Sequence, residues 1–147
     1  MEITKLDIKT DERGWLAEVI KRQDLAPGRK EFGQFFVTTA QPGVSKGHHY
    51  HLRKHEWFCV IKGRGLLVLE QIDTKACEQA VIGDGNMATV RIPPGYAHAI
   101  KNVGDDLLYL LCYTDEPFDP DDADTSAYIL GNLDGSDARA GTKPHSS

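Results

Sequence analysis

Histidines dominate the residues of this chain that could perform chemistry. Four of them, His48, His49, His51 and His55, fall within eight residues, and His98 follows a Pro-Pro-Gly turn. Neutral imidazole is the commonest metal-binding side chain in proteins. Side chains two residues apart on a strand point to the same face, so His49 and His51 would form a ready pair of ligands. This cluster indicates a metal site.

The remaining ligands must come from other strands. His98 stands after its turn as a ligand from a distant strand should, and Glu56 opens the strand that follows a polar turn. Glu56 and His55 are adjacent, so only one of them can face the metal. Both faces of that strand are apolar, so periodicity does not decide between them. We expect a metal held by His49, His51, Glu56 and His98, with His48 on the surface or behind the ligands.

An acid–base group must also lie close to such a metal. Tyr96 precedes His98 by two residues, and His55, if it is not a ligand, could act as a base because imidazole titrates near working pH. Tyr50 lies between two ligands and by strand parity faces away from them. We therefore expect Tyr96 and His55 to be catalytic residues.

Short β-rich runs would have to position these residues. The 14 glycines and 7 prolines punctuate the chain at short intervals, and the segments between them favour strands. No long helical periodicity competes, which predicts an all-β sandwich or barrel. The strands are expected at residues 15–20, 34–39, 57–61, 66–72, 88–92 and 107–113, with a short edge strand at 128–130.

The length and charge of the chain limit the class of protein. With 147 residues it is expected to form one domain over residues 1–130, followed by a flexible polar tail over 131–147. The acidic segment 115–124 is expected to be a solvated loop. A net charge of -5 disfavours nucleic-acid binding, and no apolar run approaches a membrane span. We expect a cytoplasmic protein whose cysteines, Cys59, Cys77 and Cys112, are buried, reduced thiols.

Two motifs in this chain resemble those of the cupin superfamily. The first consists of Gly43, His49, His51, Glu56 and Gly63, and the second of Pro93, Gly95, His98 and Asn102. The second motif usually opens with a glycine where this chain has Met87. The resemblance implies a single-domain jelly-roll barrel that holds a metal inside.

The match narrows further over roughly residues 11–130. The stretch 33–51, the segment 92–98 and the Phe118-Asp119-Pro120 region are similar to the C-terminal cupin domain of bifunctional capsular-polysaccharide enzymes. Those domains bind zinc and epimerise a nucleotide-linked 4-keto-6-deoxy sugar. Lys46 stands where related sugar epimerases carry a basic residue, so the resemblance implies a catalytic Lys46. It also implies a homodimer.

The same ligands would serve other reactions. Zinc can polarise a carbonyl and stabilise an enolate, which supports either epimerisation or an aldol cyclisation of a small carbonyl substrate. Residues 49–56 are also similar to stand-alone cupin cyclases of aromatic polyketide pathways. Iron, manganese or nickel in the site would fit a dioxygenase instead, because ligand type rarely fixes the metal. A metal-dependent sensor that is not an enzyme is the remaining alternative.

Overall fold

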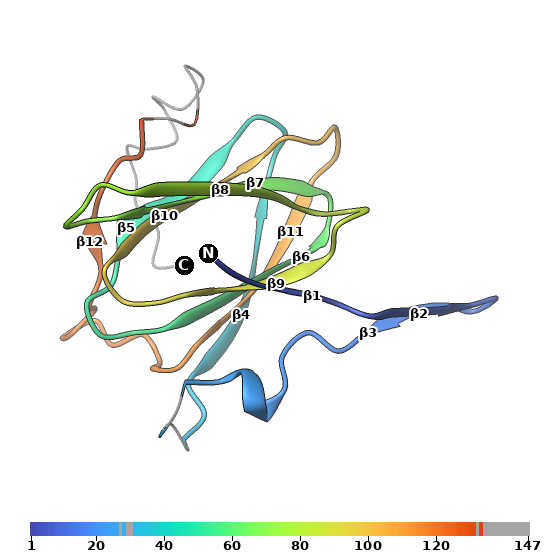
Figure 1. Ribbon diagram of the computed structural model, residues 1–147, viewed down its shortest axis with the longest axis horizontal. Coiled ribbons are helices and arrows are strands. Elements are labelled where there is room, and N and C mark those ends of the chain that lie inside the picture. Colours follow the sequence, from blue (N-terminus) through green and yellow to red (C-terminus); the bar gives the residue numbers. More distant parts are fainter. Residues whose placement is uncertain (27, 29–30, 132, 134–147) are drawn as a thin grey trace.

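The chain folds into two five-stranded antiparallel sheets that face each other around a common core (Figure 1). The computed structural model describes residues 1–26, 28, 31–131 and 133. The first sheet has the order β1-β9-β6-β11-β4 and the second the order β12-β5-β10-β7-β8. The prediction of an all-β jelly-roll barrel is thereby confirmed. The strands are β1 (Glu2–Lys5), β2 (Ile8–Asp11), β3 (Gly14–Ala17), β4 (Gln34–Ala40), β5 (Ser45–Tyr50), β6 (Glu56–Lys62), β7 (Arg64–Gln71), β8 (Cys77–Gly83), β9 (Ala88–Ile92), β10 (Tyr96–Asn102), β11 (Leu108–Thr114) and β12 (Ser126–Ala127).

Both faces of the first sheet are covered at β6. On the inner face, Phe58 and Val60 join the main core, which they share with apolar residues of β7, β9 and β11. On the outer face, Trp57 packs under the segment that contains the short 3₁₀ helix Arg22–Asp24, and its indole N–H donates to the Asp24 carbonyl at 3.0 Å. Burial on two faces explains why β6 reads as a continuous apolar run.

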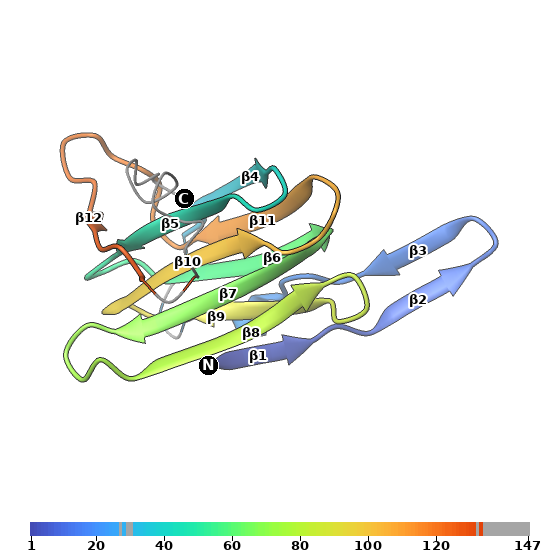
Figure 2. The same cartoon turned by 90° about the horizontal axis from the view of Figure 1, so that it is seen from above.

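Most of the predicted strands match the structure. Those at 34–39, 57–61, 66–72, 88–92 and 107–113 correspond to β4, β6, β7, β9 and β11, with ends that differ by two residues or fewer. The strand expected at 15–20 is shorter in the structure, where β3 ends at Ala17, and β5 and β10 are not among the expected ranges. The ranges also miss β1, β2 and β8, because the exposed positions of these strands carry charged and polar side chains. The hairpin of β2 and β3 projects beyond the barrel (Figure 2).

The expectation of buried thiols is correct for two cysteines and wrong for the third. Cys59 and Cys112 are buried in the first sheet, and burial raises the pKa of the Cys59 thiol to about 11. Cys77 is exposed because β8 is an edge strand of the second sheet whose first positions face solvent. None of the three forms a disulfide.

The chain after the last long strand packs back onto the barrel. The edge strand expected at 128–130 lies instead at β12, which pairs with β5. Leu130 and Leu133 are buried against the outer face of the second sheet, where they contact the cluster around Val68. The rest of the expected tail, residues 132 and 134–147, lies outside the described residues.

Candidate metal centre

Four potential metal ligands converge between the two sheets. Each of these residues offers one ligand atom, and the four atoms lie within 4.8 Å of one another. Glu56 Oε1 is 2.6 Å from His51 Nε2 and 3.0 Å from His98 Nε2, and the rings of His49 and His51 are 5.0 Å apart. The structure therefore brings together the four residues predicted as ligands, namely His49, His51, Glu56 and His98.

A local irregularity of β5 sets the distance between its histidines and β10. His49 lies opposite His98 in the β5–β10 ladder, and their ring centroids are 4.7 Å apart. Gly47 (φ 103°) and His48 (φ 55°) form a bulge directly before His49. A Cβ at Gly47 would lie 2.9 Å from the His98 carbonyl oxygen, so glycine permits this close approach of the two strands.

The cluster is buried, and its polar atoms lack hydrogen bonds of good geometry. These atoms are both ring nitrogens of His49, Nε2 of His51 and of His98, and both oxygens of Glu56, although Glu56 Oε1 lies close to Nε2 of His51 and of His98. Polar groups that are poorly satisfied inside a protein are costly, so four ligand atoms gathered within 4.8 Å of one another need an explanation. Three imidazole nitrogens and one carboxylate oxygen form a donor set that suits Zn²⁺ and other divalent first-row metals. The residues present therefore fit a metal ion.

Two of the histidines are held in the tautomer that a metal requires. Nδ1 of His51 is 2.6 Å from the carbonyl oxygen of Asp124, and Nδ1 of His98 is 3.1 Å from that of Tyr96. A carbonyl oxygen can only accept, so Nδ1 carries the proton in both rings. Nε2 then presents its lone pair to the centre of the cluster, as in known metal sites.

Two members of the cluster, His49 and Glu56, are held in the charge state that binds a cation. At His51, burial is outweighed by contact with Glu56, which raises the pKa of this ring, so that a metal would replace the proton on it. Burial, together with the neighbouring His98, lowers the pKa of His49 to about 3, so this ring is neutral at pH 7. Burial alone would raise the pKa of Glu56, but the imidazoles of His98 and His51 close to its carboxylate outweigh this effect, and the net pKa is lowered. Neutral imidazole and ionised carboxylate are the forms that ligate metals.

The structure separates His55 from Glu56. Glu56 faces inward with Phe58, whereas His55 lies on the outer side of the sheet, its ring 6.2 Å from that of Trp57 and its Nδ1 3.0 Å from an Arg91 nitrogen. The group of ligand atoms found among the described residues does not include His55, so we assign His55 no part in the reaction proposed below. The choice that periodicity leaves open is made by packing on both faces of β6.

The other predicted residues fall on both sides of the barrel wall. Tyr96 packs against the inner core on the same strand and face as His98. Lys46 is half-buried, and its ammonium group donates to Thr38 Oγ1 at 2.8 Å. Tyr50 contacts Tyr128 on the outer side, as parity predicts. His48 also points away from the cluster, but it is buried rather than exposed, and its Nδ1 accepts from the Leu130 amide at 3.1 Å.

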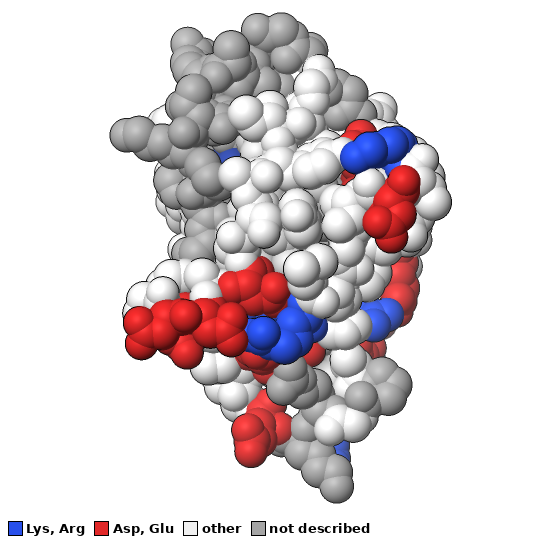
Figure 3. Space-filling model, turned by 90° about the vertical axis from the view of Figure 1, so that its left-hand side faces the viewer, with Lys and Arg blue, Asp and Glu red and all other residues white. Residues whose placement is uncertain are grey.

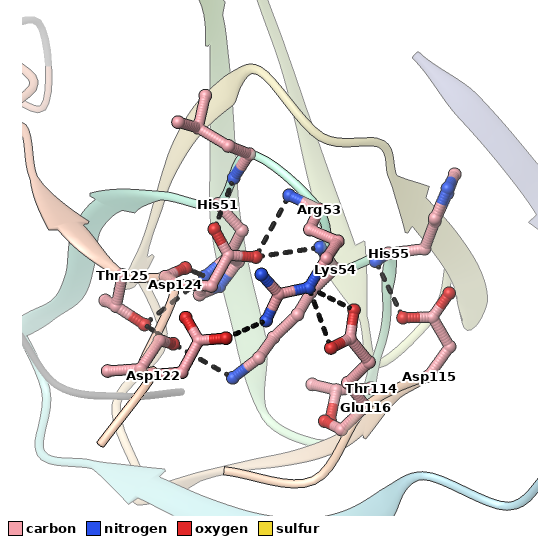
Figure 4. A network of polar contacts seen from close by, with 12 residues as sticks. His51, Arg53, Lys54, His55, Thr114, Asp115, Glu116, Asp122, Asp124 and Thr125 are labelled. Atoms are coloured by element: carbon pink, nitrogen blue, oxygen red, sulfur yellow. Dashed lines mark hydrogen bonds and ion pairs between the residues drawn. The ribbon is translucent and has the colours of Figure 1, made fainter. Parts of the chain in front are cut away.

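The acidic segment that follows β11 is an ordered part of the site. We call residues 116–124 the strap, and Figure 4 shows it against the loop between β5 and β6. The Asp124 carboxylate accepts from the amides of Leu52, Arg53 and Lys54 at 2.9–3.0 Å. Its carbonyl accepts from His51, as described above. The sequence does not predict this role, since the partners lie about 70 residues away along the chain.

Arg53 joins the strap from the other side. Its guanidinium pairs with Glu116 at 2.9 Å and with Asp122 at 3.1 Å. Figure 3 shows Asp and Glu side chains gathered on this face of the molecule next to Lys or Arg side chains. The expectation of a purely solvated loop is therefore wrong for the part of the segment that contacts the β5–β6 loop, although several of its aspartates are exposed.

We expect Asp124→Ala to weaken metal binding by about 10- to 100-fold, the usual effect of losing a group that orients a ligand. The variant loses three amide contacts, and it places alanine at a φ of 48°, which alanine tolerates poorly. A chelator competition titration measures the affinity. Asp121→Ala, a change at an exposed strap position, is the matched control and should bind metal like the wild type. Wild-type affinity in Asp124→Ala would show that the strap does not position His51.

Among the described residues, no helix has the length and apolar character needed to cross a membrane.

Comparison with known proteins identifies relatives of this chain. It is 36% identical over 122 residues to a UDP-2-acetamido-2,6-beta-L-arabino-hexul-4-ose reductase of Pseudomonas aeruginosa, which covers 83% of this chain but only 31% of that protein. It is 29% identical to the "Probable low-salt glycan biosynthesis epimerase Agl13" of Haloferax volcanii, which covers 84% of this chain and 83% of that protein.

A solved structure gives the same result. The capsular polysaccharide assembling protein CapF of Staphylococcus aureus matches with a TM-score of 0.65 and 32% identity, over 85% of this chain and 34% of that one. The chain thus spans about a third of the length of CapF and of the Pseudomonas relative. The profile of the family described as "Polysaccharide biosynthesis C-terminal domain" matches residues 9–126, and the chain belongs to this family.

Proposed function

We propose that this protein is a metal-dependent epimerase that acts on a nucleotide-linked 4-keto-6-deoxy sugar. The observation that carries the proposal is the buried cluster of three histidines and Glu56, whose poorly satisfied ligand atoms lie close together. The names of its relatives support the substrate class, because one is a reductase of a UDP-linked hexulose and another an epimerase of glycan biosynthesis.

In this proposal His49, His51, Glu56 and His98 hold a divalent ion, with zinc as the first choice. Such an ion, when bound, supplies a Lewis acid that stabilises negative charge on a carbonyl oxygen. The contribution of the protein is to fix the ligands. The Asp124 and Tyr96 carbonyls hold two imidazoles in one tautomer, and the packed core around Phe58 keeps bulk water away from the cluster.

Epimerisation requires removal of a proton from the carbon next to the carbonyl and return of a proton to the opposite face. We assign the proton return to the Tyr96 hydroxyl, which shares a strand face with His98. The proton that leaves the opposite face passes to a water molecule in the site, and the electron pair it leaves behind is delocalised onto the carbonyl oxygen. We assign to Lys46 the stabilisation of negative charge on the substrate. Tyr96→Phe should then slow epimerisation by about 100-fold, the lower range for loss of an acid–base group, while the bound metal stays at wild-type stoichiometry.

The test is wash-in of deuterium from D₂O into a nucleotide-linked 4-keto-6-deoxy sugar, followed by mass spectrometry. Metal-loaded protein should incorporate one deuterium at each epimerised carbon, at least about 100-fold faster than buffer alone. Treatment with a chelator should abolish the exchange, and added zinc should restore it. Exchange no faster than in buffer, with the metal bound, would contradict the proposal and favour the polyketide cyclase or dioxygenase alternatives.

Two further proposals concern the oligomeric state and the substrate class. We keep the homodimer as a proposal that sedimentation of the purified chain can test. The comparisons favour a sugar substrate over a polyketide, because the names of the relatives refer to hexulose, glycan and capsular polysaccharide.

A further inference from the structure

A pocket of about 270 Å³ opens beside the metal cluster. We call it the mouth pocket, and its walls come from the start of β4, the end of β11, the β5–β6 loop and the strap. It adjoins the cluster because Thr114, one of its walls, pairs directly with Glu56 in the β6–β11 ladder. It is lined by Gln34, Phe36, Val37, Thr38, Lys54, Thr114 and Phe118.

Lys54 brings a buried positive charge to this pocket. Its side chain is only 4% exposed, and its ammonium group donates to the Ala123 carbonyl at 3.1 Å and lies 5.7 Å from the centre of the Phe118 ring. Within the described part of the chain, the ion pairs include no carboxylate partner for Lys54. A buried ammonium group without a counter-ion is costly, and an anionic ligand would offset that cost.

Arg53, the residue before Lys54, does have carboxylate partners. Arg53 is half-exposed and is neutralised by two strap carboxylates, Glu116 and Asp122. The strap thus supplies acidic partners to Arg53 but only a carbonyl and an aromatic ring to Lys54, although both lysine and arginine lie in the same loop. Glu116 and Asp122 of the strap pair with Arg53 and the Asp124 carboxylate accepts from backbone amides, so none of these three is an ion-pair partner of the Lys54 ammonium group.

A second ammonium group lies next to this pocket, because it contacts one of the lining residues. Lys46 Nζ is 2.8 Å from Oγ1 of Thr38, which lines the pocket, and the described residues again include no carboxylate that pairs with this lysine. Phe36 and Phe118 add two aromatic surfaces. Two cations with hydroxyl groups and aromatic rings form a site for a phosphate ester that carries a planar base.

We propose that the mouth pocket binds the diphosphate group of a nucleotide-linked substrate, with Lys54 as its principal cation and Lys46 as the second. The proposal rests on the proposed function for the position of the sugar. The volume of the mouth pocket, about 270 Å³, is slightly below the roughly 300–1,000 Å³ of pockets that enclose a whole ligand. A pocket of this size suits one part of an extended substrate.

Calorimetric titration of the metal-loaded protein with inorganic pyrophosphate, UDP, dTDP and uridine tests the proposal. Pyrophosphate and at least one of the two nucleotides should bind, and the nucleotide at least about 10-fold more tightly than uridine. Lys54→Met keeps most of the aliphatic stem, and it should weaken nucleotide and pyrophosphate binding by about 10- to 100-fold, as expected for loss of a charged hydrogen bond. The bound metal should not change.

Lys62→Met is the matched control, because Lys62 is an exposed lysine at the opposite end of β6 and its loss changes the net charge equally. It should bind the nucleotide within about 2-fold of the wild type. If Lys54→Met does not fold, Lys46→Met, on a different strand, should weaken binding in the same direction. Equal affinities in the wild type, Lys54→Met and Lys46→Met, or no preference for nucleotide over uridine, would overturn the proposal.

The deuterium exchange assay separates this proposal from the proposed function. Wild-type protein that binds pyrophosphate through Lys54 but incorporates no deuterium would contradict the epimerase and leave the diphosphate site intact. Wild-type protein that exchanges deuterium, with an unchanged KM for the nucleotide sugar in Lys54→Met, would contradict the diphosphate site and leave the epimerase intact.

Discussion

His98→Ala is expected to remove the metal from this protein. His98 is fully buried, lies opposite His49 on the neighbouring strand and directs Nε2 at Glu56. Loss of a ligand should cost more than the 10–100-fold typical of an outer partner, so we expect affinity to fall by at least about 1,000-fold. Elemental analysis of protein purified in the presence of zinc measures the loss, and deuterium exchange should disappear with it.

The matched control is His48→Ala. His48 is adjacent to a ligand and equally buried, but its ring lies on the outer side of β5, where Nε2 contacts Ser45 and Nδ1 accepts from Leu130. Removing this ring should lower thermal stability and leave the metal content unchanged. Stoichiometric metal retained in any two of His49→Ala, His51→Ala and His98→Ala would show that the cluster is not a metal site.

The second large effect is expected at Glu56. Glu56→Gln keeps the shape of the side chain and removes the charge that compensates the cation, so we expect affinity to fall by at least about 100-fold. His55→Gln, one residue earlier, should bind metal and exchange deuterium within about 3-fold of the wild type, because His55 contacts Arg91 on the outer face. Chelator competition on the two purified variants gives both affinities.

The reverse result for this pair of variants would identify His55 as the ligand. It would require β6 to rotate its side chains by one position, which would also turn Phe58 and Val60 out of the core.

The ligand set could be predicted from local sequence because strand parity and motif spacing both act over short distances. His49 and His51 share a face for any regular strand, and His98 reaches them through an antiparallel ladder. The choice between His55 and Glu56 could not be predicted, since the outer face of β6 is covered by residues 20–26 and is as apolar as the inner face. Only the three-dimensional packing distinguishes the two faces.

The role of the strap also could not be predicted from the sequence. Its composition is that of a solvated loop, and three of its aspartates are exposed. Asp124 differs because it meets backbone amides of a loop that is distant in sequence, and it does so in a left-handed backbone conformation. Every residue except proline has a backbone amide, so residue types do not indicate which amides a carboxylate will meet. The contacts of Asp124 with the loop and with His51 therefore could not be predicted from the sequence.

X-ray absorption at the zinc edge, on the wild type loaded with one equivalent of zinc, tests the central claim most directly. We predict a first shell of three imidazole nitrogens at about 2.0–2.1 Å and one carboxylate oxygen at about 2.0–2.2 Å. The spectrum of His98→Ala, at the same zinc load, should lose one imidazole contribution. A wild-type spectrum without imidazole, or an identical spectrum in His98→Ala, would contradict a metal held by these four residues.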